Sequence, residues 1–515
     1  MNYDFDKPIN RRGTNCVKWD EAPHTAPEGA STASEALVSP SGDERGALIP
    51  LWVADMDFEA APAIREALRK RVDHGVFGYA IVQPSYYDAV IRWYERRHQW
   101  HIRREWIQYT TGVVPAISAV IKAITMPGER VLILTPVYNC FFSSIRNNGC
   151  EVLESKLVPI EAKRPTPQTP TPQTPTPNPS QGEGGLNTLS HQDIATEANQ
   201  APLPSGDWGL QSSHRCGCGP TKGSESLIRD GGQAGGGCLL TYSVDWDDFE
   251  TKCADEKTTV FLLCNPHNPA GRVWTRDELQ RMADICQRHH VRVVSDEIHC
   301  ELVMPGHEFV PFGRLFSQTP TPNPSRGEGC LDTLTTDDAT SNANQAPLPS
   351  GGAGGGCIIC CSPSKSFNTA GLQMANIICA DPETRRRIDR AININEICDV
   401  NPFAPLAVEA AYNEGAEWID ELNQYLWGNY QALLAFFAEH LPQLKVFNLE
   451  GTYLVWVDIT PTGLSADQIE EKLLSEAQVW VNSGTMYGAD GYIRINIATQ
   501  RARLMEGLER IARVI

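Results

Sequence analysis

Four polar segments of the chain carry residue types that together could do amine chemistry. They are TTGVVP at 110–115, NPHNPAG at 265–271, DEIH at 296–299 and SPSK at 362–365. Together they supply a lysine, a carboxylate, an amide, hydroxyl groups and the start of a helix. A cofactor with an aldehyde, a pyridine ring and a phosphate needs this set. An amine forms the Schiff base, an anion faces the pyridinium nitrogen, and amides hold the phosphate.

These segments are expected at one edge of a sheet, because ligands of open α/β sheets bind beyond the carboxyl ends of the strands. Apolar residues follow helical spacing at 117–124 and at 279–286, and the second pattern comes after the capping box Thr275-x-x-Glu278. The alternation of strand and helix patterns predicts an α/β fold with a mainly parallel sheet. Apolar runs of buried-strand length lie at 131–136, 259–264, 291–296, 357–362 and 376–381.

The pattern divides the chain into two predicted domains. The large domain spans 48–385, and a smaller α+β domain combines 1–47 with 386–515, where a long helical stretch precedes several short strands. Two Pro- and Gly-rich segments, about 162–238 and 317–356, interrupt the large domain and share a repeated stretch. Because they contain few large apolar residues, we expect them to be inserted loops without a stable fold.

The composition excludes some function classes. The 515 residues carry a formal net charge of −19, which argues against nucleic acid or an anionic membrane as a partner. No apolar run reaches the length of about 18 residues that a membrane span needs. The N-terminal sequence lacks the apolar stretch of a signal peptide, so we expect a cytoplasmic protein. Cys216 and Cys218 have no further ligands at matching spacing, and we expect no metal site.

Nine segments, in their order and spacing, resemble the fold-type I enzymes that depend on pyridoxal 5'-phosphate (PLP). They are most similar to MalY/PatB-type cystathionine β-lyases, which are related to class I and II aminotransferases. The resemblance covers nearly the whole chain apart from the two inserted segments and a patch near 21–47. It implies the fold-type I transferase fold, with a seven-stranded, mainly parallel sheet, and PLP as the cofactor. The segments are LWVADMDF, FGY, TTGVVPAI, TPVY, NPHNPAGRVW, SDEIH, SPSKSFNTAG, GTYLVWVD and IRINIA.

The resemblance assigns roles around the cofactor ring. Lys365 should form the Schiff base and then act as general base on the substrate Cα. Asp296 should face the pyridine nitrogen, with Asn268 at the ring oxygen and Tyr138 stacked on the ring. His299 stands where many aminotransferases have tyrosine, so a cofactor contact and a structural role both stay open.

The phosphate is expected at the start of the helix that follows Gly112. The amides of Val113 and Val114 should bind it, together with the hydroxyl groups of Ser362 and Ser364. Related aminotransferases often have an arginine shortly after the lysine, whereas residues 367–372 contain none.

Four more residues are expected to complete the site. Tyr79 of the FGY segment should reach the phosphate of a neighbouring subunit, which implies a homodimer with shared active sites. Arg494 should bind the substrate α-carboxylate, since its guanidinium group fits a carboxylate with two hydrogen bonds. Trp52 and Asp55 should border the substrate entrance.

The resemblance favours a carbon–sulfur β-lyase that converts L-cystathionine or a similar cysteine S-conjugate into a thiol, pyruvate and ammonia. A thiolate leaves readily at neutral pH, since the pKa of a thiol is about 8.5. An aminotransferase of the same fold is one alternative. A non-catalytic or regulatory protein is another, because the second inserted segment ends just before the strand that carries Lys365.

Overall fold

The fold is taken from a computed structural model, which describes residues 2–21, 48–162, 239–316, 356–394 and 399–515. Its main sheet has seven strands in the order β2-β10-β9-β8-β7-β3-β4. Six strands run parallel, and β10 is antiparallel to both of its neighbours. The predicted seven-stranded, mainly parallel sheet is therefore confirmed. The strands are β2 (Ile107–Thr110), β3 (Arg130–Thr135), β4 (Glu151–Lys156), β7 (Thr258–Cys264), β8 (Arg292–Asp296), β9 (Ile358–Cys361) and β10 (Ala375–Cys379).

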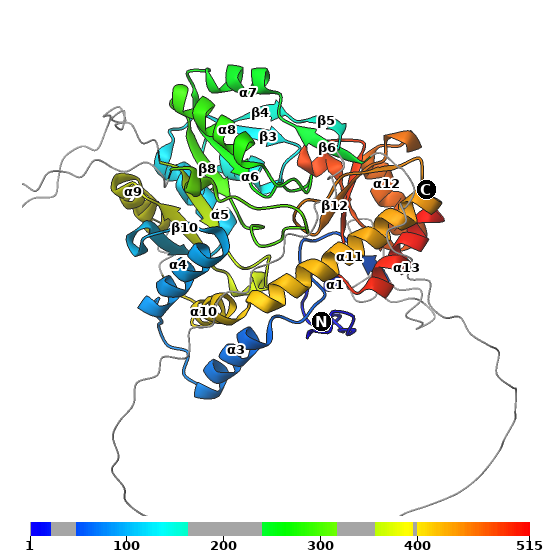
Figure 1. The fold of residues 1–515 in the computed structure, drawn as a ribbon, viewed down its shortest axis with the longest axis horizontal. Coiled ribbons are helices and arrows are strands. Elements are labelled where there is room, and N and C mark those ends of the chain that lie inside the picture. The colour runs from blue at the N-terminus through cyan, green and yellow to red at the C-terminus, as the bar shows by residue number, and fades with distance from the viewer. Residues whose placement is uncertain (1, 22–47, 163–238, 317–355, 395–398) are drawn as a thin grey trace, which may run out of the picture. The chain divides into compact units, whose positions relative to one another are not determined.

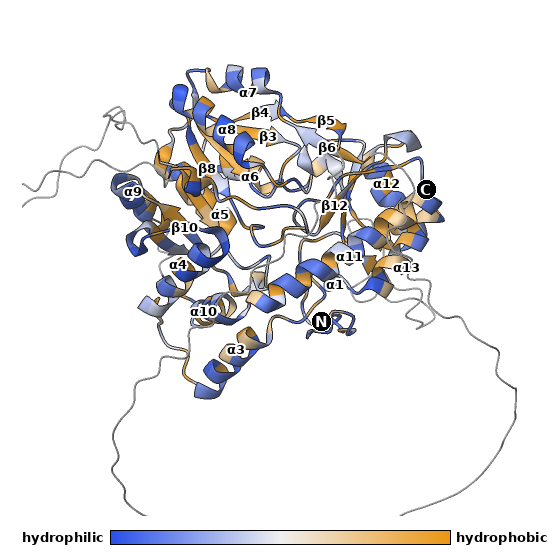
Figure 2. Cartoon of the chain, in the orientation of Figure 1, coloured by the Kyte–Doolittle hydropathy of each residue, from blue (hydrophilic) through white to orange (hydrophobic). Residues whose placement is uncertain are grey.

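Helices cover this sheet and bury its apolar strands. In Figure 2 the strands β3, β8 and β10 are largely hydrophobic, whereas helix α9 is mostly hydrophilic. This pattern is typical of a parallel sheet that is covered on both faces. The helices of this part are α3 (Pro62–His74), α4 (Pro84–His98), α5 (Val113–Ile124), α6 (Cys140–Asn147), α7 (Trp246–Cys253), α8 (Arg276–Arg288) and α9 (Pro382–Asn393).

Two helices form where the sequence predicted them. The apolar residues predicted for one face of α5 are all buried, namely Ile117, Val120, Ile121 and Ile124. Helix α8 begins with the predicted capping box, in which Thr275 Oγ1 accepts from Glu278 N–H and the Glu278 carboxylate accepts from Thr275 N–H. Such reciprocal bonds satisfy amides that have no partner within the helix.

A second sheet of four strands lies in the C-terminal part, in the order β11-β12-β15-β14. The segment VWVN at 479–482 is one of the short strands predicted for the smaller domain. It is divided, because β13 (Val479–Trp480) pairs with β1 (Ile49–Pro50) and β14 (Asn482–Ser483) pairs with β15. Long helix α11 crosses towards α13 in Figure 1. The domain boundary near 385 stays a prediction. The remaining elements are α1 (Val17–Asp20), α10 (Ala404–Glu414), α11 (Ala416–His440), β11 (Lys445–Val446), β12 (Leu454–Asp458), α12 (Ala466–Lys472), β15 (Tyr492–Asn496) and α13 (Arg501–Ala512).

The two inserted segments and the Cys216/Cys218 pair lie outside the described residues. The chain around the first segment is held by antiparallel strands β5 (Val158–Glu161) and β6 (Leu240–Ser243), in which Glu161 pairs with Leu240. Among the described residues, none of the helices has both the length and the apolar character to cross a membrane.

The capping box of α8 gives a test of local stability. Replacing Thr275 by Ala should lower the free energy of unfolding by about 1 kcal/mol, because the Glu278 amide loses its acceptor. Urea unfolding of the cofactor-free protein measures this change. As a control, Thr251→Ala should change the free energy by less than about 0.5 kcal/mol, since the Thr251 hydroxyl is exposed and donates to Asp247 O within the same helix, α7. Equal losses in both variants would show that the cap does not stabilise the helix.

Candidate active site

Lys365 lies in the turn that follows strand β9, at the carboxyl edge of the main sheet. Its Nζ donates to the carbonyl oxygen of Ala54, at 2.7 Å. Desolvation lowers the pKa of this amine, and Arg494 lowers it further, while Asp55 and Asp296 act in the opposite direction. The lysine is therefore held in surroundings that favour its neutral form, which is the nucleophilic and basic form.

Asp296 is the last residue of β8, the strand beside β9, so both side chains come from the same edge of the sheet. The carboxylate is buried, and Oδ1 accepts from Ile298 N–H at 3.1 Å. Burial raises the pKa of Asp296 to about 7, although the Ile298 amide and Lys365 lower it. A cation placed against this carboxylate would stabilise its charged form.

The loop after Asp296 is fixed by two buried carboxylates. Glu297 accepts from Ser295 Oγ and from the Phe312 amide, and burial raises its pKa to about 8. Glu301 contacts His98 Nε2 and accepts from Trp93 Nε1, each at 2.6 Å. These bonds tie the loop to helix α4 and so fix the direction in which Asp296 leaves the sheet.

Arg494 comes from β15 of the smaller sheet and is buried among polar partners. Its Nη1 donates to Asn268 Oδ1 at 3.1 Å, and its Nη2 donates to the carbonyl oxygen of Trp52 at 2.8 Å. Its guanidinium carbon lies 4.8 Å from the ring centre of Tyr487. The Nε atom is buried and has no hydrogen-bond partner within the described part of the chain.

His299 and two tyrosines surround these charged groups. Burial lowers the pKa of His299 to about 3, with further lowering by Lys365 and Arg494, so the imidazole is neutral. Its Nδ1 is buried without a hydrogen-bond partner among the residues that the structure describes. Its ring packs edge-on against Tyr453, with centroids 6.0 Å apart. Burial also raises the pKa of Tyr138, which feels the charges of Asp296 and Arg494.

The predicted phosphate site lies at the start of α5. Val113 is the first helical residue, and no side chain caps this end of the helix. Gly112 is extended, with φ of 166°, so its backbone does not require glycine. The Ser362 hydroxyl donates to Met374 O at 2.6 Å and accepts from the Ser364 amide. In this structure the Ser362 proton is therefore already engaged.

The structure brings some predicted residues together and leaves one apart. Asp55 neighbours the carbonyl that receives Lys365 Nζ, and Trp52 supplies the carbonyl that receives Arg494. The Trp52 ring stacks on Trp480, with centroids 4.0 Å apart. Tyr79 is 95% exposed, so its side chain is not part of the buried group within this chain.

Sequence reasoning missed several side chains that line or support the site. Tyr453 donates to Ala54 O at 2.9 Å, beside Lys365. It lies within GTYLVWVD, so the motif contained a signal for it. Tyr487 lies under Arg494 but belongs to a segment without a regular apolar pattern. Cys140, the first residue of α6, is close enough to Lys365 and Tyr138 to affect the pKa of both groups.

Comparison with known proteins identifies the family. The family described as aminotransferase class I and II matches residues 47–166 and 238–511. The chain belongs to this family. It is 31% identical to cystathionine beta-lyase PatB of Bacillus subtilis over 509 residues, which cover 98% of each protein. Protein MalY of Escherichia coli is 26% identical over 98% of this chain and 97% of its own length.

A solved structure within the same fold also matches over the full length. Cystalysin from Treponema denticola, whose crystal structure contains a pyridoxal 5'-phosphate cofactor, superposes with a TM-score of 0.70 and 28% identity. The match covers 100% of this chain and 99% of that chain. The fold-type I architecture that the sequence predicted is confirmed, as is the resemblance to MalY and PatB.

The raised pKa of Asp296 predicts how the stability of the cofactor-free protein depends on pH. Between pH 4 and 7 the unfolded carboxyl group loses its proton while the folded one keeps it. The folded state then binds more protons, so Asp296 makes the protein less stable as the pH rises. Asp296→Asn should remove this contribution, which amounts to about 4 kcal/mol at most across the window. Thermal unfolding from pH 4.5 to 8.5 measures it.

The gain in melting temperature from Asp296→Asn should grow steadily with pH up to about pH 7. Glu297→Gln provides a comparison. The pH range over which its stability difference from the wild type changes should extend about one unit higher, to about pH 8. A difference between Asp296→Asn and the wild type that is the same at every pH would contradict the assignment of a buried, protonated Asp296.

Proposed function

We propose that the protein is a PLP-dependent carbon–sulfur β-lyase. It would cleave L-cystathionine or a similar cysteine S-conjugate to a thiol, pyruvate and ammonia. The observation that carries this proposal is the pair of neighbouring strand ends that hold Lys365 and Asp296, in a chain 31% identical to a cystathionine beta-lyase over 98% of its length.

The residues of the site fit PLP. The buried carboxylate of Asp296 suits a protonated pyridine nitrogen, because a cation there would offset the desolvation that raises its pKa. The start of α5 presents backbone amides without a side-chain cap, as an anionic phosphate requires. The unpartnered Nδ1 of His299 is a further polar atom that a ligand could satisfy.

When bound, PLP supplies an electron-withdrawing ring that stabilises negative charge at the substrate Cα. Lys365 can then act as the general base that takes the Cα proton. Its lowered pKa increases the fraction of neutral amine that can act as a base, and its contact with Ala54 O orients the Nζ atom.

Arg494 is suited to hold the α-carboxylate of an amino-acid substrate. Its guanidinium group is fixed by the side chain of Asn268 and the carbonyl of Trp52, while Nε is free to donate. An arginine that is fixed before the substrate arrives loses little entropy on binding. It would therefore determine which face of the substrate Cα is turned towards Lys365.

Cleavage of the C–S bond follows from the chemistry of sulfur. As the Cβ–S bond breaks, its electron pair leaves with the sulfur, and the resulting thiolate is stable because the pKa of a thiol is about 8.5. The three-carbon remainder is released and hydrolysed to pyruvate and ammonia. The class I and II aminotransferase family also supports a second function, transamination, in which a keto acid would be required as amino acceptor.

Assay with L-cystathionine separates these two functions. We expect pyruvate and a free thiol to appear in equal amounts without any added keto acid. Lys365→Ala should lower kcat by at least about 100-fold, because the base is lost. The matched control Lys252→Ala removes a lysine that pairs with Asp248 on α7 and should leave kcat unchanged. Turnover that requires a keto acid would show an aminotransferase instead.

We also propose that the protein acts as a homodimer with shared active sites. The segment before α4 leaves several apolar side chains exposed, with exposed fractions of 61% for Val76, 53% for Phe77, 95% for Tyr79 and 71% for Ile81. Such a group of exposed apolar residues is typical of an interaction surface. A second copy that covers it would receive Tyr79 from this chain.

Mixing two inactive variants tests the shared site. Tyr79→Ala and Lys365→Ala should each have little activity alone. A mixed dimer contains one site with both residues intact, so random exchange should restore about one quarter of wild-type activity, as expected for a two-fold symmetric interface. Activity that stays at the level of the separate variants, in a mixture shown to form mixed dimers, would contradict the shared site.

A further inference from the structure

The segment Trp52–Asp57 forms one wall of the candidate active site without belonging to a helix or a strand. Its backbone oxygens accept hydrogen bonds from two side chains of the candidate site: Ala54 O accepts from Lys365, and Trp52 O accepts from Arg494. Asn496 Nδ2 donates to Val53 O and to Asp55 O, at 2.6 and 2.7 Å. An irregular segment of this kind depends on such outside contacts for its shape.

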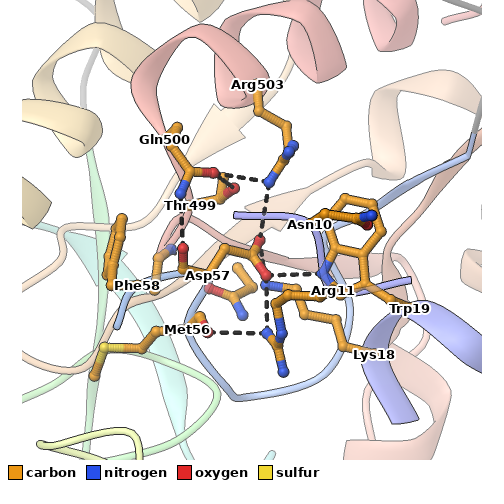
Figure 3. Close-up of polar contacts among 12 residues, drawn as sticks. Asn10, Arg11, Lys18, Trp19, Met56, Asp57, Phe58, Thr499, Gln500 and Arg503 are labelled. Carbon is orange, nitrogen blue, oxygen red and sulfur yellow. Dashed lines mark hydrogen bonds and ion pairs between the residues drawn. The ribbon is translucent and has the colours of Figure 1, made fainter. Parts of the chain in front are cut away.

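The last residue of this segment, Asp57, is anchored in a buried ionic cluster (Figure 3). Its side chain is fully buried and accepts from Arg11, Lys18 and Trp19 at 2.8–2.9 Å. Burial would raise the pKa of Asp57, but Lys18, Trp19 and Arg11 together lower it to about 2. Removing one partner from a buried ion pair is costly. The cluster therefore fixes the N-terminal residues 11–19 relative to the segment Trp52–Asp57.

Arg11 connects this cluster to the active site. Its Nη1 and Nη2 donate to the two oxygens of Asp55 at 3.0 and 2.7 Å, while Nη1 also contacts Asp57 and Met56 O. This forked geometry fixes the orientation of a carboxylate as well as its position. Lys18 Nζ lies 3.8 Å from the same carboxylate. Arg11 and Lys18 therefore both hold the Asp55 carboxylate.

We propose that Arg11 is a positioning residue for the active site: it fixes the carboxylate of Asp55, the residue that follows Ala54, whose carbonyl oxygen accepts from the Lys365 amine. The inference rests on the proposed function, in which Lys365 is the reacting base. Arg11 touches neither the substrate nor the cofactor in this proposal. It acts through Asp55.

Several charged or titratable groups face Lys365, and Asp55 has a distinct place among them. Arg494 from β15 opposes the ammonium form, as does burial, whereas Asp296 from β8 and Cys140 from α6 favour it. His299 is neutral and adds no charge. Among the charged groups, Asp55 has the largest effect on the Lys365 pKa. Moving the Asp55 carboxylate should therefore change the pKa of Lys365 more than moving any of the other charged groups.

The test is the pH dependence of acetylation of Lys365 in the cofactor-free protein. Acetic anhydride reacts only with the neutral amine, and peptide mass spectrometry measures the fraction modified at residue 365. Asp55→Asn should lower the pH of half-maximal reactivity by about one unit, because an opposite charge beside the ammonium is lost. Arg11→Met should lower it by a similar amount, because the carboxylate is no longer held in place.

The direction of the Arg11→Met effect distinguishes positioning from simple neutralisation. If Arg11 only compensated the charge of Asp55, its removal would strengthen the attraction between the Asp55 carboxylate and the Lys365 ammonium group. The pH of half-maximal acetylation would then rise. A raised or unchanged midpoint in Arg11→Met would overturn the proposal. The double variant Arg11→Met/Asp55→Asn should match Asp55→Asn alone, since both changes act through the same carboxylate.

Two further variants control the experiment. Lys7→Met removes an exposed ion pair with Glu59 from the same N-terminal segment and should leave the midpoint unchanged. Arg11→Lys keeps a charge against Asp57 but cannot form the fork to Asp55, so it should shift the midpoint as Arg11→Met does. It also serves if Arg11→Met does not fold. Because acetylation needs no turnover, loss of the lyase assignment would leave this result interpretable.

Discussion

Exclusion of water from one edge of the main sheet is the constraint on which the site depends. It acts on an amine and a carboxylate in opposite senses, since it lowers the pKa of Lys365 and raises that of Asp296. Both groups are thereby driven towards their neutral forms. The amine becomes a usable base, and the acid is left ready to ionise when a cation is placed against it. Parallel pairing of β8 with β9 puts both residues at the same edge.

The smaller sheet contributes a side chain to this site. Arg494 comes from β15, and the carbonyl groups that orient it and Lys365 come from the segment Trp52–Asp57. That segment is preceded by β1, which pairs with β13 in the C-terminal part. Lys365, Asp296 and Arg494 thus come from three distant stretches of chain, and the segment Trp52–Asp57 links Lys365 with Arg494 through hydrogen bonds.

The sequence was informative where a residue is tied to a regular element. Lys365 and Asp296 follow apolar strands, and the capping box Thr275-x-x-Glu278 is local, so strand ends and helix starts could be predicted. The division of VWVN between two partners could not, because pairing of short strands depends on distant residues. The fold and the family were predictable, while the roles of individual site residues stay predictions.

The buried ionic cluster of Arg11, Lys18 and Asp57 could not be predicted from the sequence. Its members are separated by irregular distances, and a lysine or an arginine near the N-terminus is normally exposed to solvent. Only the folded chain shows that Lys18 is fully buried. Tyr453 was missed for a related reason, since an aromatic residue in an apolar segment is normally part of the core. Tyr487 lies in a segment without a regular apolar pattern, which gave no signal for it.

The ionic cluster around Asp57 also has a consequence for how the protein is made. Arg503 of α13 approaches the same carboxylate at 3.9 Å, and Gln500 donates to the Asp57 carbonyl. Residues near the start of the chain are therefore joined to residues that the ribosome adds near the end. Domains generally fold from the N-terminus during translation, but the contacts of Asp57 with Gln500 and Arg503 can form only after α13 has been synthesised.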